Sequence, residues 1–116
     1  YLPNKTSSVS HSITGFNSSD LRDKKYINVK CIDILDILIE KYQIIKLDIE
    51  GAEIKVLNHI LDNDIYPTFL CIEFDLYLKH KDENNETQKI VDRLISKGYK
   101  IIKNDNLNIT FQLENQ

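Results

Sequence analysis

The chain is poor in the residues that interrupt regular structure, with three glycines and two prolines in 116 residues. Together with 41% hydrophobic residues, this composition excludes a disordered chain and is typical of a globular one. A chain of this length forms one domain at most. The glycines, Gly15, Gly51 and Gly98, stand too far apart to form a glycine-rich loop of the G-x-G kind.

The chain also lacks an excess of positive charge, a long apolar run and a cysteine framework. Its net charge of −3 is made of mixed signs, so we expect no nucleic-acid partner. No run reaches the roughly 18 apolar residues of a membrane span, and no signal-peptide pattern opens the chain. The two cysteines, Cys31 and Cys71, each lie in an apolar run, where buried free thiols are the simplest expectation. These features predict a cytoplasmic protein without a membrane span.

Segments of strand and helix character alternate along most of the chain. Residues 1–25 are rich in Ser, Thr, Asn and Asp and predict a loop-rich lead-in to an α/β core over 26–116. In this core we expect strands at 26–32, 43–49, 68–74 and 99–103, and helices at 34–42, 51–63 and 86–97. Residues 107–113 alternate strictly after a short turn and predict a hairpin. The order predicts an α/β fold whose mainly parallel sheet ends in an antiparallel hairpin.

Acidic side chains stand where two of the predicted strands end. Asp48 and Glu50 close one strand, and Glu73-Phe74-Asp75 close the next in the same way. If the two strands run parallel, both groups of acids lie at the same edge of the sheet. Side-chain alternation places Lys46, Asp48 and Glu50 on one face, with Lys46 close enough to pair with Asp48. Ligands of open α/β sheets bind beyond the carboxyl ends of the strands, so these acids mark a candidate site.

Glu53 is the unusual residue of the helix that follows. Winding the helix at about 100° per residue places Glu53 in the middle of the apolar stripe, so its carboxylate should point toward the sheet. A purely structural interpretation stays open, because acids in the first helical turn are stabilised by about 0.3–1 kcal/mol each. Glu53 would then bond helix-start amides as in a capping box, and the polar strand face would simply be solvated. Gly51 favours function slightly, since it permits close approach of a ligand to the backbone.

The segment KLDIEGAE at 46–53, followed by Val56 and Leu57, closely resembles the K-x-D-x-E-G-x-E motif of the FkbM family of S-adenosylmethionine-dependent methyltransferases. The flanking order is also similar to that family: a serine-rich stretch, a helix-capping Asp33, a strand ending in Ile72-Glu73, and a helix ending in Gly98-Tyr99 before the hairpin. The resemblance covers roughly residues 3 to 113. Its specific part is the eight-residue motif.

The resemblance implies a class I, Rossmann-like methyltransferase that acts on hydroxyl oxygens of a sugar, a glycolipid or a small metabolite. The implied catalytic carboxylates are Asp48, Glu50 and Glu53, with Glu53 supporting the other two. The implied substrate-binding residues are Lys46, Glu73 and His80, the last in the loop after the third strand. The implied cofactor is S-adenosylmethionine. A divalent cation is compatible with an oxygen-rich cluster, but no spacing requires one, and we assign no metal ligand.

One departure from the family pattern concerns the methyl donor. The N-terminal half, with the glycine-rich loop that would hold the cofactor, has no counterpart in this sequence. We therefore expect residues 1–116 to be a partial domain, the C-terminal half of the fold. By itself it should bind S-adenosylmethionine poorly, and its unpaired sheet edge would be a site of association.

Two further functions remain as alternatives. A non-catalytic interaction module, or a remnant of the same fold, would use the sheet edge and the acidic strand ends for binding. A metal-dependent nuclease is suggested by the E-x-K triplet at 53–55. Helical periodicity around this triplet and the lack of a basic surface argue against the nuclease.

Overall fold

A computed structural model describes residues 29–38, 43–75, 82 and 84–114. Within these residues, four strands form one open sheet in the order β1-β2-β4-β3. The strands are β1 (Ile44–Leu47), β2 (Phe69–Glu73), β3 (Tyr99–Asn104) and β4 (Asn108–Leu113). β1 and β2 pair in parallel, whereas β4 is antiparallel to both β2 and β3. The predicted α/β class and its closing antiparallel hairpin are confirmed.

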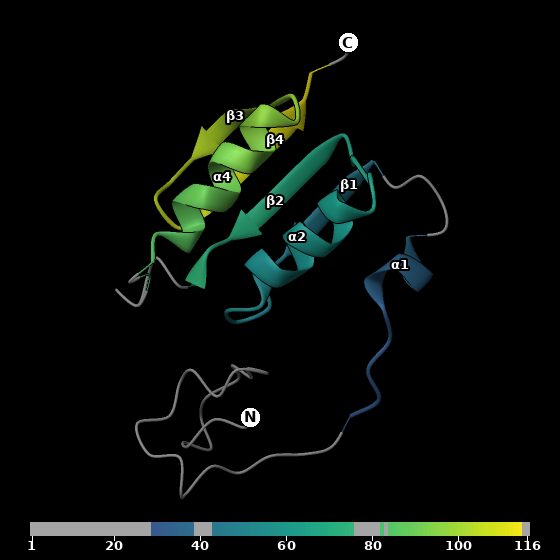
Figure 1. Cartoon of the computed structure of the whole chain (residues 1–116). Helices are drawn as coiled ribbons and strands as arrows, with labels where there is room; N and C mark the ends of the chain where they lie inside the picture. The colour runs from purple at the N-terminus through teal and green to yellow at the C-terminus, as the bar shows by residue number, and fades with distance from the viewer. Residues whose placement is uncertain (1–28, 39–42, 76–81, 83, 115–116) are drawn as a thin grey trace, which may run out of the picture.

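The place of β4 in the sheet was not predicted. β4 returns from β3 and lies between β3 and β2 (Figure 1). Three of the four described strands thus run in one direction, although only β1 and β2 form a parallel pair. The carboxyl ends of β1, β2 and β3 consequently lie along the same edge of the sheet.

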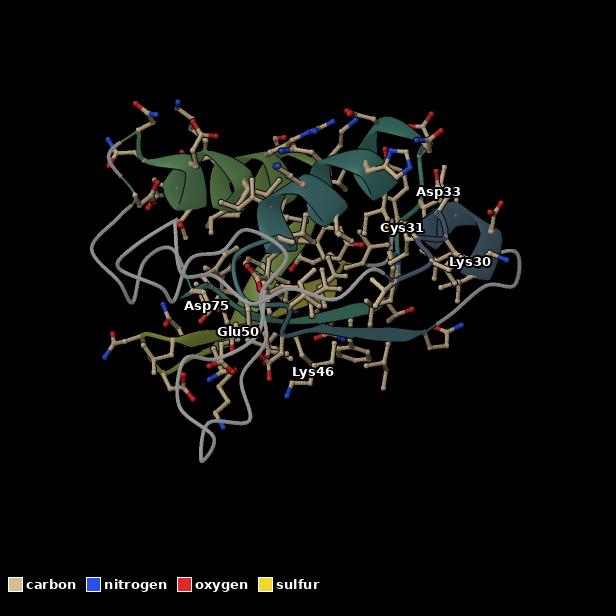
Figure 2. The ribbon with its side chains drawn as sticks, turned by 90° about the horizontal axis from the view of Figure 1, so that it is seen from below. Lys30, Cys31, Asp33, Lys46, Glu50 and Asp75 are labelled. Carbon is tan, nitrogen blue, oxygen red and sulfur yellow. The ribbon has the colours of Figure 1, made fainter. Side chains whose placement is uncertain are left out.

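Two amphipathic helices, α2 (Glu53–Asp62) and α4 (Glu86–Ser96), cover one face of this sheet (Figures 1 and 2). Their apolar stripes meet the inward side chains of the strands in a single core. The most deeply buried members are Leu57, Ile60, Leu61, Leu70, Ile72, Phe74, Ile90, Leu94 and Phe111. Both helices match the predicted ranges to within two residues at each end. Among the described residues, no helix has the length and apolar character needed to cross a membrane.

The predicted strand at 26–32 is wrong over the part that the structure describes. Residues 29–33 have no regular structure and pair with no described strand. Val29 and Ile32 are 66% and 62% exposed, so their β-branched side chains gain none of the cross-strand packing that favours a strand. The lead-in at 1–25 and residues 26–28 lie outside the described residues.

The predicted helix at 34–42 appears as the short α1 (Ile34–Ile37), and residues 39–42 lie outside the described part. Asp33 caps this helix as predicted, since its carboxylate accepts the Leu35 N–H at 2.9 Å. The same carboxylate lies 2.9 Å from His59 Nε2, which ties α1 to α2. The Leu35 N–H, followed by His59, lowers the pKa of Asp33 below its ordinary value of 3.8.

The face of β2 that lies away from the helices is only half-buried. Leu70 and Ile72 point into the core, whereas Phe69, Cys71 and Glu73 are of intermediate exposure. The two cysteines were expected to be buried free thiols. Both are free thiols, but the expected burial is wrong, because Cys31 is exposed and Cys71 is half-buried. An apolar run such as 68–74 does not reveal whether one or both faces are covered, because strand composition reflects packing on either face.

Candidate active site at the carboxyl ends of the strands

The chain leaves β1 through a tight turn in which two consecutive residues have left-handed backbone angles. Glu50 has a φ of 55° and Gly51 a φ of 100°. Glycine adopts this region freely. A glutamate there is strained by about 1–2 kcal/mol, because its Cβ approaches the following carbonyl oxygen. Such strain persists only where surrounding contacts hold it in place.

Glu53 supplies these contacts. Its side chain is 1% exposed, and its Oε1 accepts the Ile49 N–H at 2.9 Å. Both carboxylate oxygens also accept the Gly51 N–H, at 3.2 and 3.1 Å. The predicted inward orientation of Glu53 is confirmed. The capping-box geometry is not found, because Glu53 is the first helical residue and bonds amides that precede the helix.

Three carboxylates meet beyond this turn: Asp48, Glu50 and Asp75 offer oxygens that all lie within 4.8 Å of one another. We call these three residues the acid group. Asp48 is exposed, Glu50 half-buried and Asp75 buried. Figure 2 shows Glu50 and Asp75 meeting from the segments that follow β1 and β2. The predicted convergence of acids from two strand ends is thus observed.

Asp75 is the member that the predicted site residues did not include. It follows the core residue Phe74, is 5% exposed, and stands two positions after Glu73. The available signal was the spacing Glu73-Phe74-Asp75, in which an apolar residue separates two acids at a strand end. Glu73 itself is half-buried on the outer sheet face, in register with Asn108.

The remaining predicted residues are placed as follows. Lys46 pairs with Asp48, with Nζ 3.6 Å from Oδ2, which confirms the predicted ion pair. Figure 2 shows Lys46 on the face of the sheet opposite the helices. Both side chains are largely exposed, so this pair contributes at most about 1 kcal/mol. His80 lies outside the described residues.

The acid group has two chemical uses. At about 4 Å, two like charges repel each other by about 1 kcal/mol in water and by more where water is excluded. A proton or a cation placed between the carboxylates relieves this repulsion. The group can therefore accept a proton from a bound hydroxyl, or its oxygens can bind a hard cation such as Mg²⁺ or Ca²⁺.

Comparison with protein families agrees with this arrangement. The model of the methyltransferase FkbM domain matches residues 1–101, which includes β1, α2, β2, α4 and the acid group. No curated protein and no solved structure matches the chain. Because the family model covers most of the chain, this protein belongs to the FkbM methyltransferase domain family, as the motif at 46–53 predicted.

Proposed function

We propose that this chain forms the acceptor side of an S-adenosylmethionine-dependent O-methyltransferase with a Rossmann-like sheet. Its acceptor is a hydroxyl group of a sugar, a glycolipid or a small metabolite. The observation that carries the proposal is the acid group, held at the carboxyl ends of two adjacent parallel strands by the buried Glu53. Ligands of open α/β sheets bind at this edge.

Asp48 and Glu50 act on the acceptor hydroxyl. When bound, the donor supplies a methyl group on a positively charged sulfur. One of these two carboxylates would accept the hydroxyl proton of the acceptor when its oxygen is methylated. Asp75, which is buried beside them, adds a third carboxylate to the group. Asp48 and Glu50 also orient the acceptor oxygen.

Glu53 is a positioning residue in this proposal. It touches backbone amides and is enclosed in the core, so it holds the Glu50–Gly51 turn without meeting the acceptor. Lys46 and Glu73, on the outer sheet face, and His80 remain proposed residues for contacts with parts of the acceptor that extend beyond the acid group.

The described residues contain no glycine-rich loop that could bind the methyl donor. Gly51 and Gly98 are the glycines within the described ranges, and their N–H groups already bond Glu53 and the Ile95 carbonyl. We propose that residues 1–116 are a partial domain that binds S-adenosylmethionine weakly on their own. Calorimetric titration of the 116-residue chain should show no binding in the micromolar range, and a micromolar dissociation constant would contradict this part of the proposal.

The E-x-K triplet gives no support to a nuclease. Glu53 and Lys55 lie on α2, and the glutamate is buried against the turn, where it could not contact a nucleic acid. No observation favours the non-catalytic interaction module either. The methyltransferase is therefore the function that the acid group supports best.

The proposal is tested with the protein expressed at its natural length from its own gene. The protein is incubated with S-adenosylmethionine carrying a deuterated methyl group and with a panel of sugars, glycolipids and hydroxylated metabolites. Mass spectrometry should find a labelled methyl ether in at least one acceptor. If transfer occurs equally well with Asp48→Asn and Glu50→Gln, the acid group is not the site.

A further inference from the structure

A cavity of about 840 Å³ opens at the edge of the sheet where the acid group also lies. It lies between α4 and the β3–β4 hairpin, at the edge where β2 and β3 end. Phe74 lines it, and the next residue in the chain, Asp75, belongs to the acid group. Its volume falls within the range of about 300–1,000 Å³ that is usual for small-molecule sites.

Apolar side chains form much of the cavity wall: Phe74, Val91, Ile95, Ile101 and Ile109. Two of them are far more exposed than core residues, with Ile95 on α4 at 50% and Ile101 on β3 at 40%. Covering apolar surface is favourable by about 25 cal/mol per Å². An apolar part of a ligand that fills the space between these two isoleucines would gain this free energy.

The rest of the lining is polar and mainly uncharged. Asn104 ends β3, Asn106 lies in the turn that follows, and Gln88 lies on α4. The Thr87 hydroxyl is buried and has no partner of good hydrogen-bond geometry among the described residues, although it lies close enough to Asp82 to help lower the pKa of that carboxyl. A hydroxylated ligand can satisfy such a group, and a buried polar group left without a bond costs about 1–3 kcal/mol.

The charge around the cavity disfavours anions. The first amides of α4 would attract an anion, but the Asp82 carboxylate already accepts the N–H groups of Glu86 and Thr87. Asp82 also lines the cavity and adds a negative charge. An incoming phosphate or carboxylate would therefore meet repulsion and no available helix start.

We propose that this cavity binds the uncharged, partly apolar body of a hydroxylated acceptor, such as an alkyl or ring-bearing glycoside, and excludes phosphorylated acceptors. The role as an acceptor site rests on the proposed methyltransferase function, whereas the binding itself does not. The apolar wall takes the alkyl or ring portion. The amides and the Thr87 hydroxyl bond hydroxyl groups of this body. A hydroxyl on the part of the acceptor outside the cavity would then reach the acid group at the same edge of the sheet.

The test compares two probes with the same tail, octyl β-glucoside and octyl phosphate, each kept below its micelle concentration. Binding to the full 116-residue chain is measured from amide chemical shifts, without a methyl donor. Octyl glucoside should bind saturably with shifts concentrated around the cavity, and octyl phosphate at least about tenfold more weakly. Absence of saturable glucoside binding, or equal affinity for the two probes, would overturn the proposal.

The chain offers a matched pair of variants for this test. Ile101 and Ile102 are neighbours on β3, 40% and 47% exposed, but only Ile101 lines the cavity. Ile101→Lys should weaken glucoside binding at least about tenfold, whereas Ile102→Lys should leave it unchanged. Thr87→Val, which keeps the shape and removes the hydroxyl, should weaken it several-fold. Equal effects of the two lysine variants, or full affinity in Thr87→Val, would place the glucoside elsewhere.

Failure of this inference is distinguishable from failure of the proposed function. Specific glucoside binding in a natural-length protein that transfers no methyl group supports the cavity and contradicts the methyltransferase. Methyl transfer that depends on Asp48 but is insensitive to Ile101→Lys supports the methyltransferase and contradicts the cavity.

Discussion

The carboxylate of Glu53 accepts the backbone N–H of Gly51 through both of its oxygens, at 3.2 and 3.1 Å. This bond joins the first residue of α2 to the turn that follows β1. It holds Glu50 in a left-handed conformation that a glutamate rarely adopts. The position of the acid group therefore depends on a residue that is itself buried and out of reach of an acceptor.

Replacing Glu53 should weaken the fold. Glu53→Gln keeps the size of the side chain but removes the charge, and it places an amide donor next to two backbone N–H donors. Hydrogen bonds to charged groups contribute about 1.5–3 kcal/mol, so the free energy of unfolding should fall by about that amount. Urea denaturation followed by circular dichroism measures the change.

Glu86 provides the control for Glu53, because it is likewise the first residue of its helix. Its side chain is 45% exposed and pairs with Lys89, so Glu86→Gln should change the free energy of unfolding by less than about 0.5 kcal/mol. Similar losses of unfolding free energy in the two variants would mean that Glu53 stabilises the fold only as any acidic residue does in the first turn of a helix.

Neutralising the acid group should abolish methyl transfer. Asp48→Asn and Glu50→Gln remove the proton acceptors, and general-base catalysis accounts for about 10²–10⁴-fold in rate. Steady-state kinetics of the natural-length protein should show this loss in kcat. Asp92→Asn, on the exposed face of α4, is the control and should retain the full rate. A wild-type kcat in both acid-group variants would exclude these carboxylates from catalysis.

Tyr99 should be important for stability and not for catalysis. Its buried hydroxyl donates to the Pro67 carbonyl at 2.7 Å. Tyr99→Phe leaves that carbonyl without this bond and should cost about 1–3 kcal/mol of unfolding free energy. Tyr66→Phe removes a hydroxyl that bonds the exposed Asp64, and thermal denaturation should show a smaller effect. Equal effects would argue against a special role for the buried bond.

The same tyrosine predicts a loss of stability in alkali. Burial, followed by the nearby Tyr66, raises the pKa of Tyr99 above its ordinary value of 10.0. The folded state thus holds this proton more tightly than the unfolded state, so the stabilisation is complete below pH 10.0 and decreases as the pH rises above it. In urea denaturation, the wild-type protein should lose more stability above that pH than Tyr99→Phe.

Asp82 should make the start of α4 sensitive to acid. Partial burial opposes ionisation, but the N–H groups of Thr87 and Glu86 outweigh it and lower the pKa of Asp82 below its ordinary 3.8. The stabilisation is therefore present above pH 3.8 and is lost as the pH falls through the lower folded pKa. Asp82→Ala should cost about 0.5–2 kcal/mol at neutral pH, as for a lost helix cap, and much less near pH 2. A difference that does not change with pH would contradict this origin.

Chelation should leave the methyl transfer rate unchanged. In our proposal the carboxylates take the hydroxyl proton directly, although their oxygens also suit a hard cation. The rate of the natural-length protein should stay within about twofold after treatment with EDTA. A loss that added Mg²⁺ restores would show that the acid group binds a cation instead.

Local patterns in the sequence predicted most of the elements but not all of their contacts. Helical periodicity identified α2 and the inward side of Glu53, because an apolar stripe reports which face is buried. The segment 26–32 has the same kind of strand composition as 43–49, yet its described part is irregular. Composition cannot distinguish the two, since a strand forms only where a neighbour supplies hydrogen bonds.

In the candidate site, too, local patterns predicted some residues, whereas others depend on tertiary contacts. Asp48 and Glu50 were identified from their position after a strand, and Lys46 from side-chain alternation. Asp75 was noted at the next strand end, but Glu73 was chosen as the site residue in its place. The approach of Asp75 to Glu50 depends on the parallel pairing of β1 with β2, which the sequence does not fix.

The sequence by itself determined the family, through the motif at 46–53, and the faces of its helices and strands, through their periodicity. Tertiary structure alone decided that β4 lies between β2 and β3, that Asp75 and not Glu73 joins the acid group, and that a cavity opens at the same edge of the sheet. The physical reason is that periodicity is a property of neighbouring residues. The meeting of distant carboxylates depends on how whole elements pack, which no local pattern records.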